Sequence, residues 1–236
     1  MAALPLAAQS SSDISFNPNI TQAEFRKFSH LVGQGIYPTP INPAGGAGLL
    51  RFEVGGAATL VEVDNNASYW RNAVSNDFST NGYLAVPRLV ASKGLGSSSI
   101  SGTYAKVQDS DLKMYGGAYD MPIINGGLVK PTLALRVAYG RITGIDVYNL
   151  KTYGAELFLG KGIGPITPYG AVGRMYTDAR GIIPASGARP EIRLSDKSSV
   201  NRYTVGVRLN LFLPKIVVEA TQAEQRSYAA KVSFGF

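Results

Sequence analysis

The sequence predicts an all-β fold, an antiparallel up-and-down transmembrane β-barrel of about ten strands, preceded by a short N-terminal helix and a Pro-rich linker. Three observations support this fold. From Gly48 onward apolar and polar residues alternate, which is the side-chain period of a strand. Most expected strands are close to the ~10 residues that a tilted strand needs to cross a bilayer. Long and short connections alternate along the chain, as in barrels whose two ends differ.

Two segments are expected before the barrel, which we place at residues 49–236. Residues 1–12 are interpreted as the remnant of a signal peptide, with an Ala-rich cleavage site near Ala7 and Ala8, or as a disordered N-terminus. Residues 13–48 are interpreted as a periplasmic helix and linker.

The N-terminal helix has recognisable start and stop signals. Asn19 or Thr21 can cap it, and Gly33 and Gly35 are expected to end it before the extended Pro-rich stretch. Its apolar stripe consists of Ile20, Phe25, Phe28, Leu31 and Val32. Because an isolated helix of this length is marginal in water, we expect it to dock into or beneath the periplasmic mouth of the barrel, or against a partner there.

The strands are expected, in chain order, at Leu49–Val63, Tyr83–Lys93, Ser98–Val107, Leu112–Ile123, Thr132–Ile142, Leu150–Lys161, Ile166–Thr177, Asn201–Phe212, Lys215–Gln222 and Ser227–Phe236. The longest connections, residues 64–82 and 178–200, follow odd-numbered strands, and tight Gly/Pro turns follow even-numbered ones. The short link 108–111 and the longer link 125–131 are exceptions. An even number of strands leaves both chain ends on one side of the membrane.

Charged residues indicate which face of each strand points inward. A barrel in water buries its apolar face, whereas a barrel in a membrane turns that face to lipid and lines its interior with polar groups. Most strands carry Arg or Glu opposite their aromatic residues, which favours the membrane barrel. The expected lumen-lining residues are Arg51, Glu53, Arg88, Asp120, Arg136, Glu156, Arg174, Arg202, Arg208, Glu219 and Lys231. The expected aromatic girdle consists of Tyr83, Tyr139, Tyr153, Tyr169, Tyr203, Tyr228, Phe234 and Phe236.

Two interpretations of the charged lumen stay open. Ion pairs can fill a narrow barrel and hold it shut. Alternatively, surplus Arg side chains can line a narrow path that prefers anions.

Composition excludes several classes of function. The formal charge of +7 is dispersed along the chain, whereas a nucleic-acid interface usually concentrates its positive residues. The absence of Cys excludes a disulfide scaffold and a thiolate metal site. The sequence contains no run of about 18 apolar residues, so no transmembrane helix is predicted.

Candidates for catalysis are few. The single His30 falls in the N-terminal helix, outside the expected barrel, where a surface or packed role is the ordinary interpretation. Glu156 and Glu219 could be imagined as paired carboxylates, although Arg partners on neighbouring strands favour ion pairs. The sequence offers no set of His or Cys metal ligands, and no cofactor is expected.

Four segments, Val86–Leu89, Ser92–Leu95, Leu159–Gly162 and Thr167–Arg174, together with the final strand that ends at Phe236, resemble small bacterial outer-membrane β-barrel proteins. In those proteins the assembly machinery reads the C-terminal strand. The resemblance implies a non-enzymatic protein of the outer membrane, in contact with membrane lipid and lipopolysaccharide and with both termini in the periplasm. Its role would be structural, in assembly, or that of a narrow channel, and its helix could meet a periplasmic or outer-membrane partner.

Two other classes of function remain as alternatives. The first is a soluble or surface β-sandwich that binds a partner, since sandwich strands show the same alternation. The second is an outer-membrane enzyme acting on lipid or peptide, which the lack of a His on any expected strand disfavours.

Overall fold

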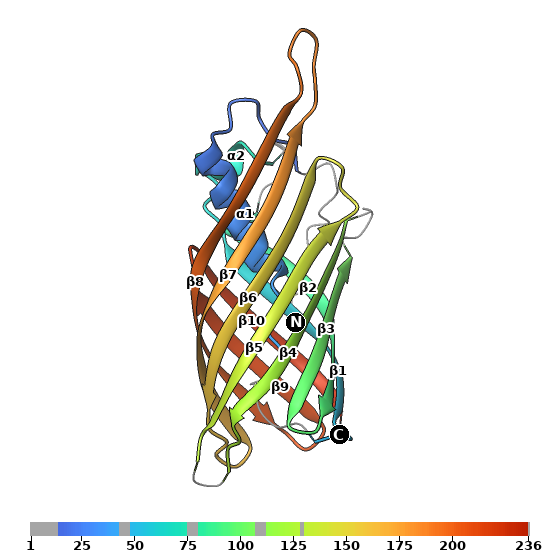
Figure 1. Ribbon diagram of the computed structural model, residues 1–236, viewed down its shortest axis with the longest axis vertical. Coiled ribbons are helices and arrows are strands. Elements are labelled where there is room, and N and C mark those ends of the chain that lie inside the picture. The colour runs from blue at the N-terminus through green and yellow to red at the C-terminus, as the bar shows by residue number, and fades with distance from the viewer. Residues whose placement is uncertain (1–13, 43–47, 75–79, 107–111, 128–129, 236) are drawn as a thin grey trace.

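The computed structural model describes residues 14–42, 48–74, 80–106, 112–127 and 130–235 (Figure 1). Its elements are α1 (Gln22–Ile36), β1 (Phe52–Glu62), α2 (Ser68–Arg71), β2 (Tyr83–Leu95), β3 (Ser98–Lys106), β4 (Lys113–Ile124), β5 (Thr132–Thr143), β6 (Tyr148–Gly160), β7 (Ile166–Ile183), β8 (Ile192–Asn210), β9 (Pro214–Gln222) and β10 (Arg226–Gly235). Strands that follow one another in the chain pair with each other, and β1 closes the ring by pairing with β10. This single closed, antiparallel barrel confirms the predicted fold class, and it is not the alternative two-sheet sandwich.

The two ends of the barrel carry different connections. The links β1–β2, β5–β6, β7–β8 and β9–β10 lie at one end, here called the loop end. The turns β2–β3, β6–β7 and β8–β9 lie at the other, the turn end, together with the end of β10 (Figure 1). Within the described residues no helix is long and apolar enough to cross a membrane.

The β7–β8 hairpin is longer than the sequence suggested. Residues 178–200 were expected to be a loop, but they pair from Asp178–Lys197 up to Ile183–Ile192 and rise beyond the other strands (Figure 1). The strand period continues there, because Ala179 is buried inside while Arg180 is exposed outside. Its Pro, Gly and Ser residues cluster near the hairpin tip and concealed this alternation.

Helix α1 lies inside the barrel, in the half nearer the loop end and away from the end where β10 stops (Figure 1). Thr21 caps it, and Glu24 completes a capping box by accepting from the backbone N–H of Thr21. The helix runs on through Gly33 and Gly35, contrary to the expected stop. A Cβ on Gly33 would lie 3.2 Å from Cγ2 of Thr152, so the missing side chain lets the helix approach the wall.

The interior of the barrel changes character along its axis. In the loop half, Phe25, Phe28 and Leu31 of α1 form one buried apolar cluster with wall residues such as Val61 and Leu150. In the turn half the interior is charged and the outer surface is apolar. Exposed apolar residues of that outer surface include Leu89, Val137, Leu157, Val172, Val205 and Val218. The turn half therefore has the inverted polarity that a bilayer requires.

Candidate functional site

The charged interior of the turn half is the candidate site, and Glu53 lies at its centre near the turn end. Oε1 of Glu53 lies 2.7 Å from an Nη of Arg51, 2.8 Å from one of Arg208 and 3.0 Å from Nζ of Lys215. Lys231 approaches the other oxygen of Glu53 at 4.0 Å. Several cations thus share one buried carboxylate, a distribution that leaves positive charge in excess at this level of the lumen.

Two further ion pairs lie deeper in the lumen. Arg136 donates to both oxygens of Asp120, at 2.6 and 3.0 Å, and its guanidinium lies 4.2 Å from the ring centre of Phe158. Arg202 donates to Glu156 at 3.1 Å. All of these charged side chains are buried, so each pair needs good geometry to offset the cost of desolvation.

Residues Tyr37–Asn42, which follow α1, run through this charged region as an extended, fully buried segment. Together with α1 they are called the plug. Arg88 donates to the carbonyl of Tyr37 at 2.8 Å, and Thr59 donates to that of Thr39 at 2.9 Å. Lys231 donates to Oδ1 of Asn42 at 2.6 Å. Wall side chains therefore satisfy the backbone of the plug, as a buried chain without secondary structure requires.

The plug also fits the wall sterically. A Cβ on Gly154 of β6 would overlap the ring of Tyr37, so the bare backbone of that strand makes room for the aromatic side chain. The sequence contains no local signal for this contact, because its two partners are far apart in the chain.

The structure places nearly all the expected lumen residues inside, but Arg174 lies outside. On β7 the inward residues are Tyr169, Gly173 and Met175, so the assumption that the charged face of this strand points inward was wrong. Arg174 lies near the exposed Tyr176, with its guanidinium 5.6 Å from that ring. This position lets a charged side chain reach toward water from the outer surface.

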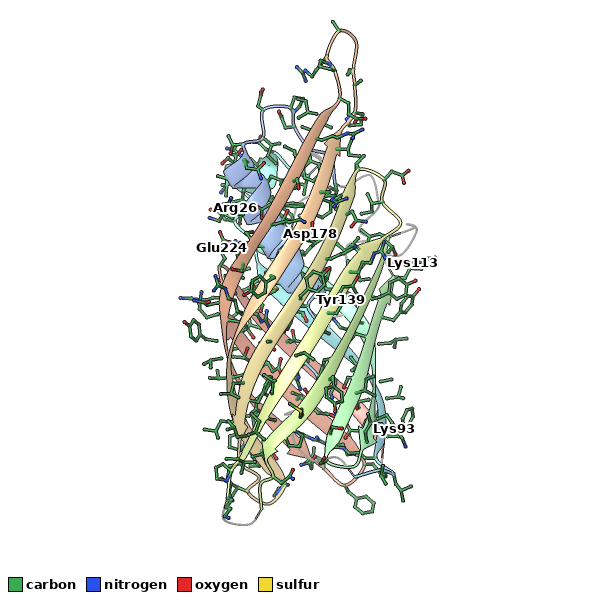
Figure 2. All side chains as sticks on the ribbon, in the orientation of Figure 1. Arg26, Lys93, Lys113, Tyr139, Asp178 and Glu224 are labelled. Carbon is green, nitrogen blue, oxygen red and sulfur yellow. The ribbon has the colours of Figure 1, made fainter. Side chains whose placement is uncertain are left out.

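Tyr169 was expected in the aromatic girdle, but it also lies on the opposite face of β7 from the one expected. Its side chain is buried in the lumen and its hydroxyl donates to Glu219 at 2.6 Å. The outward-facing members of the expected girdle are Tyr83, Tyr139, Tyr153, Tyr203, Tyr228 and Phe234. Tyr139 projects outward from β5 (Figure 2). Phe236 lies outside the described residues.

The sequence analysis missed four outward tyrosines, Tyr104, Tyr115, Tyr119 and Tyr176. The rings of Tyr104 and Tyr115 contact each other across β3 and β4, tilted and with centres 5.4 Å apart, and Tyr176 lies opposite Tyr153 across β6 and β7. Tyr139 and Tyr153 make an equivalent pair at 5.4 Å. The same alternation that identified the other tyrosines would have found these four, since each lies on the outer face of its strand.

His30 was expected outside the barrel, but it is packed inside, 5% exposed, where α1 meets the wall. Its Nδ1 contacts Glu224 of the β9–β10 turn and its Nε2 lies 2.6 Å from Oγ of Ser198 on β8. Ser198 in turn contacts Asp196, which Arg26 of α1 meets at 2.9 Å. In Figure 2, Arg26 and Glu224 lie close to α1 at the same side of the barrel.

This arrangement resembles a Ser–His–carboxylate triad. Its hydrogen bonds instead favour a structural contact that holds α1 against the wall of the barrel. Ser198 has one proton, and the carboxylate of Asp196 can only accept it. The hydroxyl oxygen of Ser198 then accepts from Nε2 of His30, and the other ring nitrogen contacts Glu224. A serine held in this way does not donate to the imidazole, as a nucleophile must.

Glu156 and Glu219, the other candidates for catalysis, are bonded to other residues of the lumen. Glu156 accepts from Arg202 and from Tyr37 at 3.3 Å, and Glu219 accepts from Tyr169, so they do not form a pair of free carboxylates. No group of three or more His, Cys, Asp or Glu within the described residues could hold a metal ion.

An antiparallel barrel with an apolar outer band, outward tyrosines and a charged interior is the architecture of a bacterial outer-membrane β-barrel protein. No family model matches the sequence, and no curated protein matches it. Three similar solved structures share little of its sequence. The N-terminal β-barrel domain of OprF from Pseudomonas aeruginosa is 11% identical, covers 81% of this chain and 99% of its own, and gives a TM-score of 0.35.

Neisserial surface protein A is 13% identical, with coverage of 78% and 97% and a TM-score of 0.32. Ail, the attachment invasion locus protein of Yersinia pestis, solved with the heparin analogue sucrose octasulfate, is 11% identical, with coverage of 79% and 97% and a TM-score of 0.30. The assignment to the architecture rests on this chain's own strand pairing and polarity.

Proposed function

We propose that this chain is a non-enzymatic integral protein of the bacterial outer membrane whose lumen is closed by its own N-terminal segment. The loop end faces outward and the C-terminal strand ends at the periplasmic side, where the assembly machinery reads it. The observation that carries this proposal is the inverted polarity of the turn half. Buried ion pairs inside and exposed Val and Leu outside would destabilise a barrel in water.

In this orientation the described N-terminal residues lie at the outer end. Ile14 forms a bridge with Val74 of the β1–β2 connection, and α1 descends from there to the extended part of the plug. The proposal thus keeps the C-terminus in the periplasm but replaces the expected periplasmic helix with one that lies within the barrel. The elevated β7–β8 hairpin becomes the most prominent outer feature, available to meet lipopolysaccharide or a partner.

Orientation and membrane insertion can be tested together. An epitope inserted at residues 184–191, the tip of the β7–β8 hairpin, should be accessible to antibody on intact cells, and one placed in the β8–β9 turn should not. The purified protein should require detergent and should migrate differently on gels before and after heating. A water-soluble monomer would contradict the membrane assignment, whereas the reversed epitope pattern would contradict only the orientation.

A narrow anion path is the second candidate function. In the turn half, buried or partly buried cations outnumber the carboxylates. The cations are Arg51, Arg88, Arg136, Arg202, Arg208, Lys215 and Lys231, and the carboxylates are Glu53, Asp120, Glu156 and Glu219. Removal of the plug would expose this surplus to the lumen and favour anions.

A further inference from the structure

An apolar groove runs along the outer surface of β5–β10. It has a volume of about 730 Å³, and its lining includes Leu157, Val172, Tyr203, Val205, Ala220 and Tyr228. The small residues Gly170 and Ala220 leave it hollow between larger neighbours. It lies below outward tyrosines, within the band that the proposed function assigns to lipid. In that band the surface is surrounded by lipid hydrocarbon chains, so such a chain is the expected occupant of the groove.

A polar pocket of about 540 Å³ adjoins the upper end of the groove. Gln222 and Arg226 line both hollows, and Nε of Arg226 donates to Oε1 of Gln222 at 3.2 Å. The hydroxyl of Tyr228 donates to Glu62 of the pocket at 3.3 Å, and its ring lies 6.4 Å from that of Tyr83. Groove and pocket are therefore continuous, apolar below and polar above.

The pocket carries hydrogen-bonding groups of both signs. Lys27 and Arg226 supply positive charge, and Glu62, Asp64 and Glu224 supply carboxylates, of which Glu224 contacts His30. Gln225 also lines the pocket and is only 9% exposed, yet neither atom of its side-chain amide has a hydrogen-bond partner among the described residues. A buried amide without partners costs free energy, so a ligand that bonds to it would gain by doing so.

We propose that the groove and pocket together bind one molecule of a phosphorylated glycolipid of the outward-facing leaflet, the lipid A class. This inference rests on the proposed function, because the loop end must face that leaflet. An acyl chain occupies the groove, and a phosphate lies between Arg226 and Lys27. Sugar hydroxyls donate to Glu62 and Asp64 and bond to the amide of Gln225.

The mixed charge of the pocket favours a sugar over a simple anionic headgroup. A headgroup with phosphate alone would face Glu62 and Asp64 without any donor for them, and like charges at short range repel. Sugar hydroxyls both donate and accept, so they match carboxylates and an amide equally well.

The test uses full-length protein, purified in detergent and stripped of lipid, and native mass spectrometry with three separate probes: bisphosphorylated lipid A, a phosphatidylethanolamine and a phosphatidylglycerol. We expect one lipid A to remain bound at activation energies that remove the phospholipids. Ala220→Trp, which fills the groove, and Arg226→Gln should each weaken retention about tenfold, the effect of losing one good contact.

Matched controls exclude general effects. Ala91→Trp adds the same ring to the outer face of β2, and Arg174→Gln removes another outward cation; both should retain lipid A as the unaltered protein does. Heat-modifiable migration checks that each variant is folded. Equal losses in controls and site variants, or equal retention of a phospholipid, would overturn the site. A protein that is monomeric without detergent would instead overturn the proposed function, on which the lipid site rests.

Discussion

The guanidinium of Arg202 lies over the ring of Tyr37, 4.2 Å from its centre, in the middle of the lumen. Both side chains also meet Glu156, which accepts from Nε of Arg202 at 3.1 Å and from the hydroxyl of Tyr37 at 3.3 Å. A wall ion pair and the first residue after α1 thus form one buried triangle. The plug is tied to the wall by charge as well as by packing, and the two cannot be altered independently.

Glu156→Ala should be strongly destabilising, because it leaves the buried guanidinium of Arg202 without its carboxylate. Breaking a buried pair from one side costs about 3–5 kcal/mol. Urea unfolding of the protein in lipid vesicles would measure the loss. Arg174→Ala is the matched control, since it removes an exposed charge and should change the free energy of unfolding by less than about 0.5 kcal/mol. Equal effects of the two substitutions would contradict the buried triangle.

Val137→Arg should impair membrane assembly, because Val137 is 45% exposed on the outer apolar band of β5. An Arg at the bilayer midplane costs a barrel about 2–4 kcal/mol. Asn149→Arg, on the outer face of β6 toward the loop end, is the control and should assemble normally. The measurement is the heat-modifiable fraction recovered from membranes; normal assembly of Val137→Arg would mean that this face does not meet lipid.

Arg136, on the same strand, has contacts that the alternation of residues could not predict. Alternation alone placed Arg136 in the lumen. The structure shows Arg136 bonded to Asp120 of the neighbouring strand and to the carbonyl of Asn42 in the plug. Its removal would leave a buried carboxylate and a buried carbonyl unsatisfied, so the cost approaches that of Glu156→Ala.

Period-two alternation was sufficient for the barrel because it is a local property of each strand. It failed at β7, where Arg174 was assigned inward, because the strand carries its charge on the outer face and its buried tyrosine inside. The path of the plug was not predictable from local pattern. It depends on contacts such as Arg88 with Tyr37 and Lys231 with Asn42, whose partners are distant in the chain.

His30→Gln should loosen the loop-end half of the plug. A glutamine side chain cannot bridge Ser198 and Glu224 as the two ring nitrogens do, so one of those wall contacts is lost. Hydrogen exchange of α1 amides should become faster, with β5 and β6 unchanged. Arg26→Gln affects the same helix, but Arg26 is half exposed and its partner Asp196 keeps the hydrogen bond from Ser198, so the effect should be smaller. Unchanged exchange in His30→Gln would show that the apolar cluster alone holds the helix.

The stability of the first turn of α1 should depend on pH through the carboxyl group of Glu24. A hydrogen bond from Ser68 of α2 and another from the backbone of Thr21 lower the pKa of Glu24 below its ordinary value of 4.5. A carboxyl with a lowered folded pKa contributes stability that is full above its unfolded pKa and is lost as pH falls through the folded one. Protection of the first turn of α1 should therefore fall below about pH 4.5, after correction for intrinsic exchange rates. Glu24→Gln should remove this dependence, and a persistent transition in that variant would assign it to another group.

Deletion of residues 14–42 should convert the closed barrel into a conducting one. The strands pair only with one another, so the ring itself should persist, although the loss of the apolar cluster around Phe25 and Phe28 should lower its melting temperature. Water then fills the lumen, and its surplus of Arg and Lys should make the conductance prefer anions in planar bilayers. Arg88→Ala, which loses the bonds to Gly35 and Tyr37 but keeps the plug in the chain, should conduct intermittently at a lower level. A deletion variant that folds, shown by heat-modifiable migration, but conducts no more than the full chain would mean that the wall side chains close the lumen without the plug.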